Sequence, residues 1–192
     1  MNILTVKEST SEKYTPRTYY NAKSADLTVA FATDLTTAGE LCTHKAAGDK
    51  YLGILLKEDS DSLSIAQQLI TALKEHNATK LNIAGNGIYT LTKNGCDQNF
   101  INYFIYNVIA EAHATHKIHK IFTGGQTGVD MAGAVAGYLL QIPTEVTLPK
   151  GYIQRFENKK DVSMTHDNIV QQIKSGADFI INNYNNKSKI KP

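Results

Sequence analysis

Short apolar segments alternate with longer segments in which apolar residues recur every three or four positions. The short segments are rich in β-branched and aromatic residues, as strands are, whereas Leu69, Ile70 and Leu73 illustrate the helical spacing. The pattern predicts strands at residues 3–6, 25–32, 51–56, 80–84, 121–123, 144–148 and 178–182. It predicts helices at 38–47, 63–76, 98–116, 131–140 and 166–175.

The predicted strands are continuous apolar runs, without regular alternation of apolar and polar positions. Such strands are covered on both faces, and strands that alternate with helices form parallel sheets. The sequence therefore predicts an α/β fold with a mostly parallel sheet between two layers of helices. No boundary divides the chain, so we expect one domain over residues 1–192, with a flexible Asn- and Lys-rich tail at 183–192.

Three polar segments interrupt this pattern. Residues 7–20, which contain Pro16, are predicted to form a loop, and so is the segment 149–161. Asn86 and Gly87 form either a glycine-bearing loop at a strand end or a hairpin turn, after which residues 88–92 would return as a strand.

The segment from Ile121 to Asp130 carries the strongest candidate chemistry. Gly124 and Gly125 follow an apolar strand, and a small polar turn leads into an apolar helix. Such a loop presents backbone N–H groups at a helix N-terminus, where the helix dipole attracts anions. We expect a phosphate there, and the alternative is an ordinary turn between a strand and a helix. The expected donors are the backbone, hydroxyl and amide groups of Gly124, Gly125, Gln126, Thr127 and Gly128.

Small, polar or glycine-rich turns follow three predicted strands, after Ala32, Ala84 and Thr123. Ligands of parallel sheets bind beyond the carboxyl ends of the strands. If these three strands are neighbours, one crevice collects all three turns. The further candidates are therefore Thr33, Asp34, Thr36, Thr37, Gly85, Asn86 and Gly87.

Charge narrows the class of ligand. The formal net charge is only +2, and the chain has two arginines, Arg17 and Arg155, so we expect no nucleic-acid partner. These arginines and Lys150 are candidate partners of a pyrophosphate, and the alternative for each is a solvated surface charge. Asp130 would bond a ribose hydroxyl or cap its own helix. Phe156 would stack on a base or pack in the core.

Several classes of protein receive no support from the sequence. Cys42 and Cys96 indicate neither a disulfide framework nor a metal site, and we expect no metal and no cofactor. No window of eighteen apolar residues occurs, so we expect no membrane partner, and we expect a cytoplasmic location, in the host cytoplasm if a phage encodes the protein.

The apolar helix at 99–112 suggests packing against a partner, and we expect a homodimer or a larger homo-oligomer.

Two parts of the chain resemble a known family. The motif Gly-Gly-Gln-Thr-Gly-x-Asp at 124–130, followed by Pro149-Lys150-Gly151, resembles the putative molybdenum carrier family of the SLOG superfamily. Arg17-Thr-x-x-Asn21, followed by Asp26-x-Thr, is similar to an element that the family places after its Pro-Lys-Gly loop. The chain therefore looks like a circularly permuted SLOG domain. The resemblance implies a Rossmann-like nucleotide-binding fold and adds Asn21 to the candidate ligand-binding residues.

The resemblance also draws attention to Glu40. Phosphoribohydrolases of this superfamily carry Pro-Gly-Gly-x-Gly-Thr-x-x-Glu at a strand end. The corresponding segment here lacks the opening glycines of that motif and has a threonine, a glycine and a glutamate at Thr37, Gly39 and Glu40. Glu40 would attack or stabilise an anomeric carbon. The alternative is a first-turn carboxylate that complements a helix dipole.

Three functions remain open from the sequence. The first is a protein that captures a nucleotide-derived signal, of the ADP-ribose type or cyclic, and keeps it intact, as a counter-defence sponge would. The second is an enzyme that cleaves or transfers at an N-glycosidic bond with Glu40. The third is an interaction module with a vestigial pocket.

Overall fold

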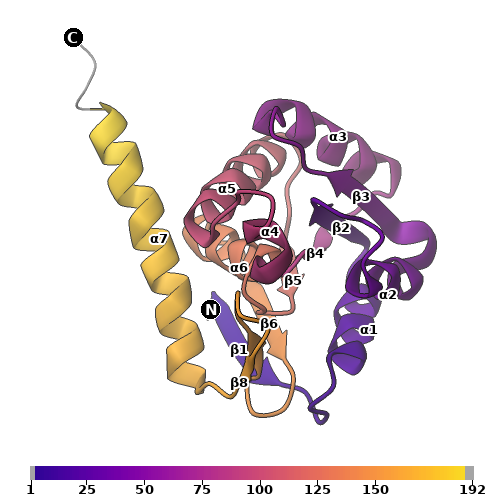
Figure 1. Cartoon of the computed structure of the whole chain (residues 1–192). Coiled ribbons are helices and arrows are strands. Elements are labelled where there is room, and N and C mark those ends of the chain that lie inside the picture. Colours follow the sequence, from indigo (N-terminus) through magenta and orange to yellow (C-terminus); the bar gives the residue numbers. More distant parts are fainter. Residues whose placement is uncertain (1–2, 189–192) are drawn as a thin grey trace.

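The computed structural model describes residues 3–188, and its centre is a six-stranded sheet between layers of helices (Figure 1). The strands lie in the order β1–β6–β5–β4–β2–β3, and all neighbours are parallel. The predicted α/β fold, a Rossmann-like three-layer sandwich, is confirmed. The strands are β1 Leu4–Glu8, β2 Leu27–Ala32, β3 Tyr51–Leu55, β4 Lys80–Gly85, β5 Lys120–Thr123 and β6 Thr144–Leu148.

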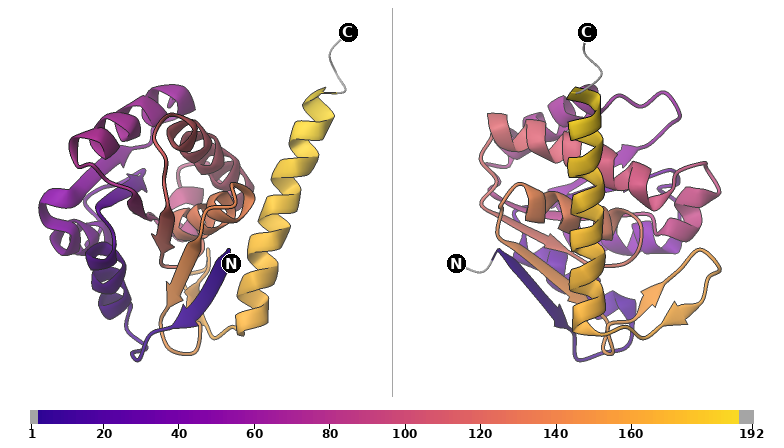
Figure 2. Two further views of the ribbon diagram at one scale, coloured as in Figure 1. Left: turned by 180° about the vertical axis from the view of Figure 1, so that it is seen from behind. Right: turned by 90° about the vertical axis from the view of Figure 1, so that its left-hand side faces the viewer.

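Helices cover both faces of the sheet. α1 (Tyr14–Ser24) and α2 (Ala38–Ala47) pack together on one face, and α3 (Ser62–Glu75), α5 (Gln98–Thr115) and α6 (Val129–Leu139) cover the other. The long helix α7 (His166–Ser188) runs along the outside of α6 and beside β1 (Figure 2). The smaller elements are α4 (Ile88–Thr92), a 3-10 turn (Gly48–Lys50), and the antiparallel pair of β7 (Gln154–Arg155) and β8 (Asp161–Val162).

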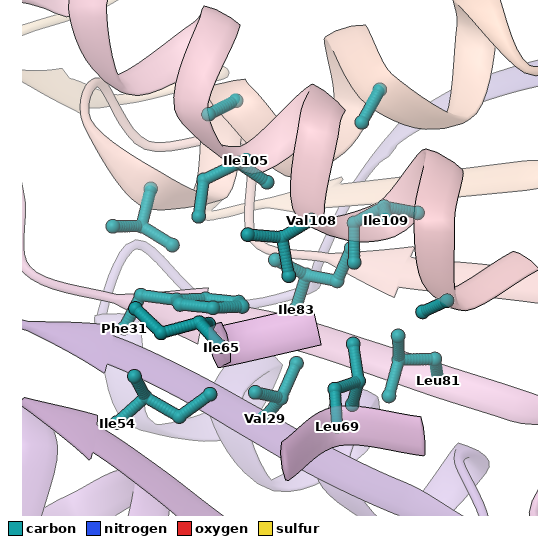
Figure 3. Close-up of a cluster of buried hydrophobic side chains, with 14 of the residues drawn as sticks. Val29, Phe31, Ile54, Ile65, Leu69, Leu81, Ile83, Ile105, Val108 and Ile109 are labelled. Carbon is teal, nitrogen blue, oxygen red and sulfur yellow. The ribbon is translucent and has the colours of Figure 1, made fainter. Parts of the chain in front are cut away.

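The two faces of the central strands differ in chemistry. Val29 and Phe31 of β2, with Ile83 of β4, enter a cluster of aliphatic side chains beneath α3 and α5 (Figure 3). Successive side chains of a strand point to opposite faces. The intervening residues of β4, Asn82 and Ala84, therefore face α1 and α2, where the packing is more polar.

A second apolar cluster attaches α7 to the sheet. Ile173, Ala177 and Ile180 are buried against residues of β1 and β6. Their spacing of four and three places them on one face of a helix. The prediction of a strand at 178–182 is therefore wrong, because these residues continue α7. Residues 183–188 of the predicted flexible tail are also helical, and residues 189–192 lie outside the described part.

Two further predictions are wrong. Half of the segment 7–20, predicted as a loop, belongs to α1, where Pro16 lies in the first turn and so removes no helical hydrogen bond. Residues 88–92 form α4 instead of a returning strand. Gly87 forms a β-bridge with Gly128, and the N–H of Ile88 donates to the carbonyl of Thr127, so Asn86 and Gly87 connect a strand to a helix.

The order in which successive strands are added to the sheet reverses at β2, although all strands remain parallel. β3 lies on one side of β2 and β4 lies on the other, so the chain crosses to the opposite half of the sheet after β3. Such a reversal opens a crevice at the carboxyl ends of the strands. β2, β4 and β5 are consecutive in the sheet, which confirms that the three polar strand ends are neighbours.

Candidate functional site

A cavity of about 440 Å³ lies at this crevice, between the carboxyl ends of β4 and β5 and the helices α1 and α2. Its volume is within the range of small-molecule sites. We call it the sheet-end cavity. Eleven candidate residues from the sequence line it, namely Arg17, Asn21, Thr37, Glu40, Gly85, Asn86, Gly87, Gly124, Gln126, Asp130 and Arg155.

Other candidates lie outside this lining. Lys150 is exposed, and its backbone N–H donates to Ser11. Phe156 and Thr127 border a different cavity. The remaining candidates outside the lining are Thr33, Asp34, Thr36, Gly125 and Gly128.

Glu40 lies at the start of α2, where the Thr37 hydroxyl caps the helix by accepting from the N–H of Glu40. Glu40 lies in the first turn of α2, as the alternative interpretation expects, but its carboxyl is buried, because only 3% of Glu40 is exposed. Its Oε1 accepts from Asn86 at 3.3 Å, and its Oε2 has no partner among the described residues. Burial, together with the charges of Asp130 and Asp34, raises the pKa of Glu40 to about 7.

Asn86 donates a hydrogen bond to Glu40, and its bonds to the backbone define the orientation of its amide group. Its Oδ1 accepts from the backbone N–H groups of Thr33 and Asp34, at 2.9 and 3.1 Å. Because backbone N–H groups only donate, the Nδ2 atom must face the other way, towards the Asp34 carbonyl and Glu40. The turn after β2 holds the side chain of Asn86, which lies between β4 and α4, and Asn86 in turn positions the carboxyl of Glu40.

A buried ion pair closes another side of the cavity. The Nη1 atom of Arg17 lies 2.8 Å from Oδ2 of Asp130, and the two side chains are 11% and 7% exposed. Burial raises the pKa of Asp130, while the guanidinium of Arg17 and the N–H of Gln126 act in the opposite direction. A Cβ on Gly124 would lie 1.3 Å from Nη1, so the ion pair occupies the space that a side chain at 124 would need.

The glycine loop does not present the open anion cradle that we expected, because several of its donors are engaged within the chain. The amide nitrogen of Gln126 donates to the Ile153 carbonyl at 2.6 Å, and the Thr127 hydroxyl donates to the Arg155 carbonyl. The N–H of Gly128 donates to Oε1 of Gln98 at 2.6 Å. These bonds attach the loop to the segment around β7 and to α5.

Most of the buried polar atoms that lack a hydrogen-bond partner belong to residues that line the sheet-end cavity. Among the side chains that the structure describes, five buried atoms have no hydrogen-bond partner, and four of them belong to residues that line this cavity. A buried polar group without a partner costs about 1–3 kcal/mol of stability. Such groups are therefore rare in natural proteins, and a cluster of them indicates a functional site. The four atoms are Nε of Arg17, Oδ1 of Asn21, Oε2 of Glu40 and Oδ1 of Asn82.

Asn82 is the residue that the sequence analysis missed. It lies inside β4 between Leu81 and Ile83, is 2% exposed, and donates to the Thr28 hydroxyl at 3.2 Å. A single carboxamide within an apolar strand is the signal that points to it, because a buried polar group in a sheet needs a reason.

Cationic groups lie at the rim of the cavity. Arg155 donates from Nε and Nη2 to the carboxylate of Asp161, at 2.8 and 2.9 Å, and its guanidinium lies 5.3 Å from the Tyr14 ring. The ammonium groups of Lys93 and Lys159 lie 4.4 and 4.3 Å from the centre of the Tyr89 ring. The rim therefore offers positive charge, whereas the floor offers carboxamide and carboxyl groups.

Comparisons with known proteins add no relative to this description: no protein-family model, no curated protein and no solved structure matches the chain. Within residues 3–188 no cluster of three or more His, Cys, Asp or Glu is placed to hold a metal ion. In the described part of the chain, no helix combines the length and apolar character needed to cross a bilayer.

Proposed function

We propose that the sheet-end cavity binds a nucleotide-derived small molecule, of the ADP-ribose type or a cyclic nucleotide. The observation that carries this proposal is that four unsatisfied polar atoms belong to residues of α1, α2 and β4 that line one cavity. A ligand with several hydroxyl or ring-nitrogen groups would satisfy them. A purely apolar ligand would leave all four unsatisfied.

Charge distribution supports a nucleotide over a simple sugar. Arg155 and the ammonium of Lys159 are at the rim, and the Nη1 atom of Arg155 is not used by its bonds to Asp161. A phosphate at the rim and a ribose or base on the floor would match both regions. The resemblance of the loop at 124–130 to SLOG proteins, and the position of the cavity where the chain reverses, favour the same class of ligand.

Binding without turnover is the first form of this function, and calorimetry with AMP, ADP-ribose and 3′,5′-cyclic AMP tests it. We expect stoichiometric binding of at least one compound and its intact recovery by chromatography. Asn82→Leu should weaken that binding at least tenfold, because it removes a floor carboxamide at similar volume. Thr147→Val is the matched control, since Thr147 also has a buried unpartnered oxygen but does not line the cavity. Equal affinities of the two variants would contradict the proposal.

Cleavage of an N-glycosidic bond is the second candidate, because Glu40 lines the cavity, has a pKa of about 7, and carries an oxygen, Oε2, without a partner among the described residues. A carboxyl with this pKa transfers protons efficiently near neutral pH. Glu40 would take a proton from a water that bonds to the anomeric carbon. The bond from that carbon to the base nitrogen would break with its electron pair on the nitrogen, which gains a proton, so one water is consumed.

Release of free base from a bound nucleotide tests this second candidate. Glu40→Gln should reduce the release at least a hundredfold while ligand affinity changes little. Glu111→Gln, at an exposed position of α5, serves as the control and should retain full activity. Intact ligand after prolonged incubation with the wild-type protein would exclude the enzyme and leave the binding protein.

A further inference from the structure

A second cavity, of about 770 Å³, lies on the other side of the glycine loop. It is bordered by α5, by α7 and by the segment after β7, and Thr127 of the glycine loop forms part of its wall. We call it the α5–α7 cavity. It has no part in the proposed function, and its volume also suits a small molecule.

A chain of hydrogen bonds determines which atom of Asn102 faces this cavity. The backbone N–H of Gly128 donates to Oε1 of Gln98 at 2.6 Å, which fixes the orientation of the Gln98 amide. The Nε2 atom of Gln98 then donates to the Gly128 carbonyl and to Oδ1 of Asn102, at 3.0 and 2.9 Å. The Nδ2 atom of Asn102 is thereby turned away from Gln98.

This Nδ2 atom is a donor without an acceptor among the side chains and backbone groups that the structure describes. Asn102 is only 2% exposed, and its one hydrogen bond to another side chain uses the oxygen. Gly176 of α7 leaves room beside it, because a Cβ at that position would lie 2.8 Å from Nδ2. Although Asn102 as a whole is buried, its Nδ2 atom is not one of the five fully buried atoms without a partner, so this donor is available to an acceptor of a ligand in the cavity.

The remaining walls describe the rest of that ligand. Seven carboxamide side chains line the cavity, among them Asn99 of α5 and Gln172 of α7, and no lysine or arginine occurs among its described lining residues. Phe156, Met131 and Met164 provide apolar surface. Carboxamides pair with the edges of heterocycles that carry both donors and acceptors, and aromatic and thioether groups pack against their faces.

We propose that the α5–α7 cavity is a second binding site, for an uncharged heterocycle with carbonyl or ring-nitrogen acceptors, such as a nucleobase or a nucleoside. The acceptor would bond Nδ2 of Asn102, and the ring would lie against Phe156. A phosphorylated compound is disfavoured, because the wall offers Glu157 and no cation among the described residues.

Nuclear magnetic resonance of the full chain tests the site with adenosine, cytosine and glucose as probes. Adenosine or cytosine should shift the side-chain amide signal of Asn102 and the backbone signal of Gly176. Ser175→Trp, at an exposed position on the rim, should fill the cavity and raise the Kd at least tenfold. Lys174→Trp is the matched control, because Lys174 is exposed on the same helix and lines neither cavity.

Each outcome decides the proposal. Asn82→Leu should leave these shifts unchanged, since Asn82 belongs to the sheet-end cavity, so failure of one site can be distinguished from failure of the other. Shifts that persist in Ser175→Trp, or that vanish in Asn82→Leu, would place the probe elsewhere. A response to glucose and to neither heterocycle would overturn the ligand class, and no response to any probe would overturn the site.

Discussion

The Nη1 atom of Arg17 lies 2.8 Å from Oδ2 of Asp130, and this contact joins α1 to α6 across the carboxyl end of the sheet. Both side chains are almost fully buried, and both line the sheet-end cavity. Removing one partner of a buried ion pair leaves an uncompensated charge, which costs far more than the pair itself contributes. The pair therefore links the shape of the cavity to the stability of the fold.

Single and double substitutions of this pair should be strongly non-additive. Arg17→Met should lower the free energy of unfolding by about 3–5 kcal/mol, because it leaves the Asp130 carboxylate buried and unpaired. Addition of Asp130→Asn to this variant should restore a large part of the loss. Urea unfolding of the four proteins at pH 7 measures the coupling, and equal, additive losses would show that the two charges do not interact.

Alanine substitutions at two glycines should differ sharply. A Cβ at Gly124 would lie 1.3 Å from the Arg17 guanidinium and 2.2 Å from the Asp130 carboxylate, so Gly124→Ala should displace the pair and cost about 2–4 kcal/mol. At Gly87 the nearest atom is 3.6 Å away, so Gly87→Ala should cost less than about 1 kcal/mol. Thermal unfolding compares the two, and similar losses would refute the assigned role of Gly124.

The stability of the protein should fall as pH rises from about 4.5 to about 7, because of Glu40. Its pKa is raised from 4.5 to about 7 in the folded protein. Between these values the folded state holds a proton that the unfolded state has released, so stability is lost as pH rises, by up to about 3 kcal/mol. Glu40→Gln should remove this loss, and the two stability curves should diverge from pH 4.5 to pH 8. Parallel curves would mean that Glu40 titrates normally.

Glu145 should give the opposite dependence at acidic pH. Burial alone would raise its pKa, but hydrogen bonds from Lys7, Lys120 and Tyr20 outweigh it and lower the pKa to about 2. The stabilisation is complete above pH 4.5 and is lost as pH falls towards 2. Because both lysines are more than one-third exposed, we expect only about 1 kcal/mol. Comparison of wild type with Glu145→Gln by urea unfolding at pH 3 and pH 6 checks this, and an equal difference at both values would contradict it.

Local patterns predicted the sheet and most helices, and they failed where distant contacts decide the structure. The segment at 178–182 has the composition of a strand, but Ile180 continues the buried face of α7 that begins with Ile169 and Ile173. Asn86 and Gly87 have the composition of a hairpin turn, but a bridge from Gly87 to Gly128 makes them the entry to α4. Neither contact is visible from neighbouring residues.

The candidate site was predicted only in part, because distant contacts also decide which of its residues face the cavity. The strand ends identified Asn86 and the glycine loop, because all parallel strands end at one edge, and the resemblance to SLOG proteins drew attention to Glu40. The sequence did not show that Gln126 would be engaged by the Ile153 carbonyl, or that Lys150 would be exposed away from the cavity. These outcomes depend on the path of the segment around β7, for which the sequence carries no periodic pattern.

The order of the strands has a consequence for how the chain folds during synthesis. Leu4 of β1 pairs with Thr144 of β6, so β1 is synthesised well before the strand with which it pairs. Pairing at such sequence separation is slow, because the entropy of closing the intervening loop must be overcome first. The strands from β2 to β5 can assemble before β6 arrives. β1 would then join the nascent sheet late, and α7 would cover that junction afterwards.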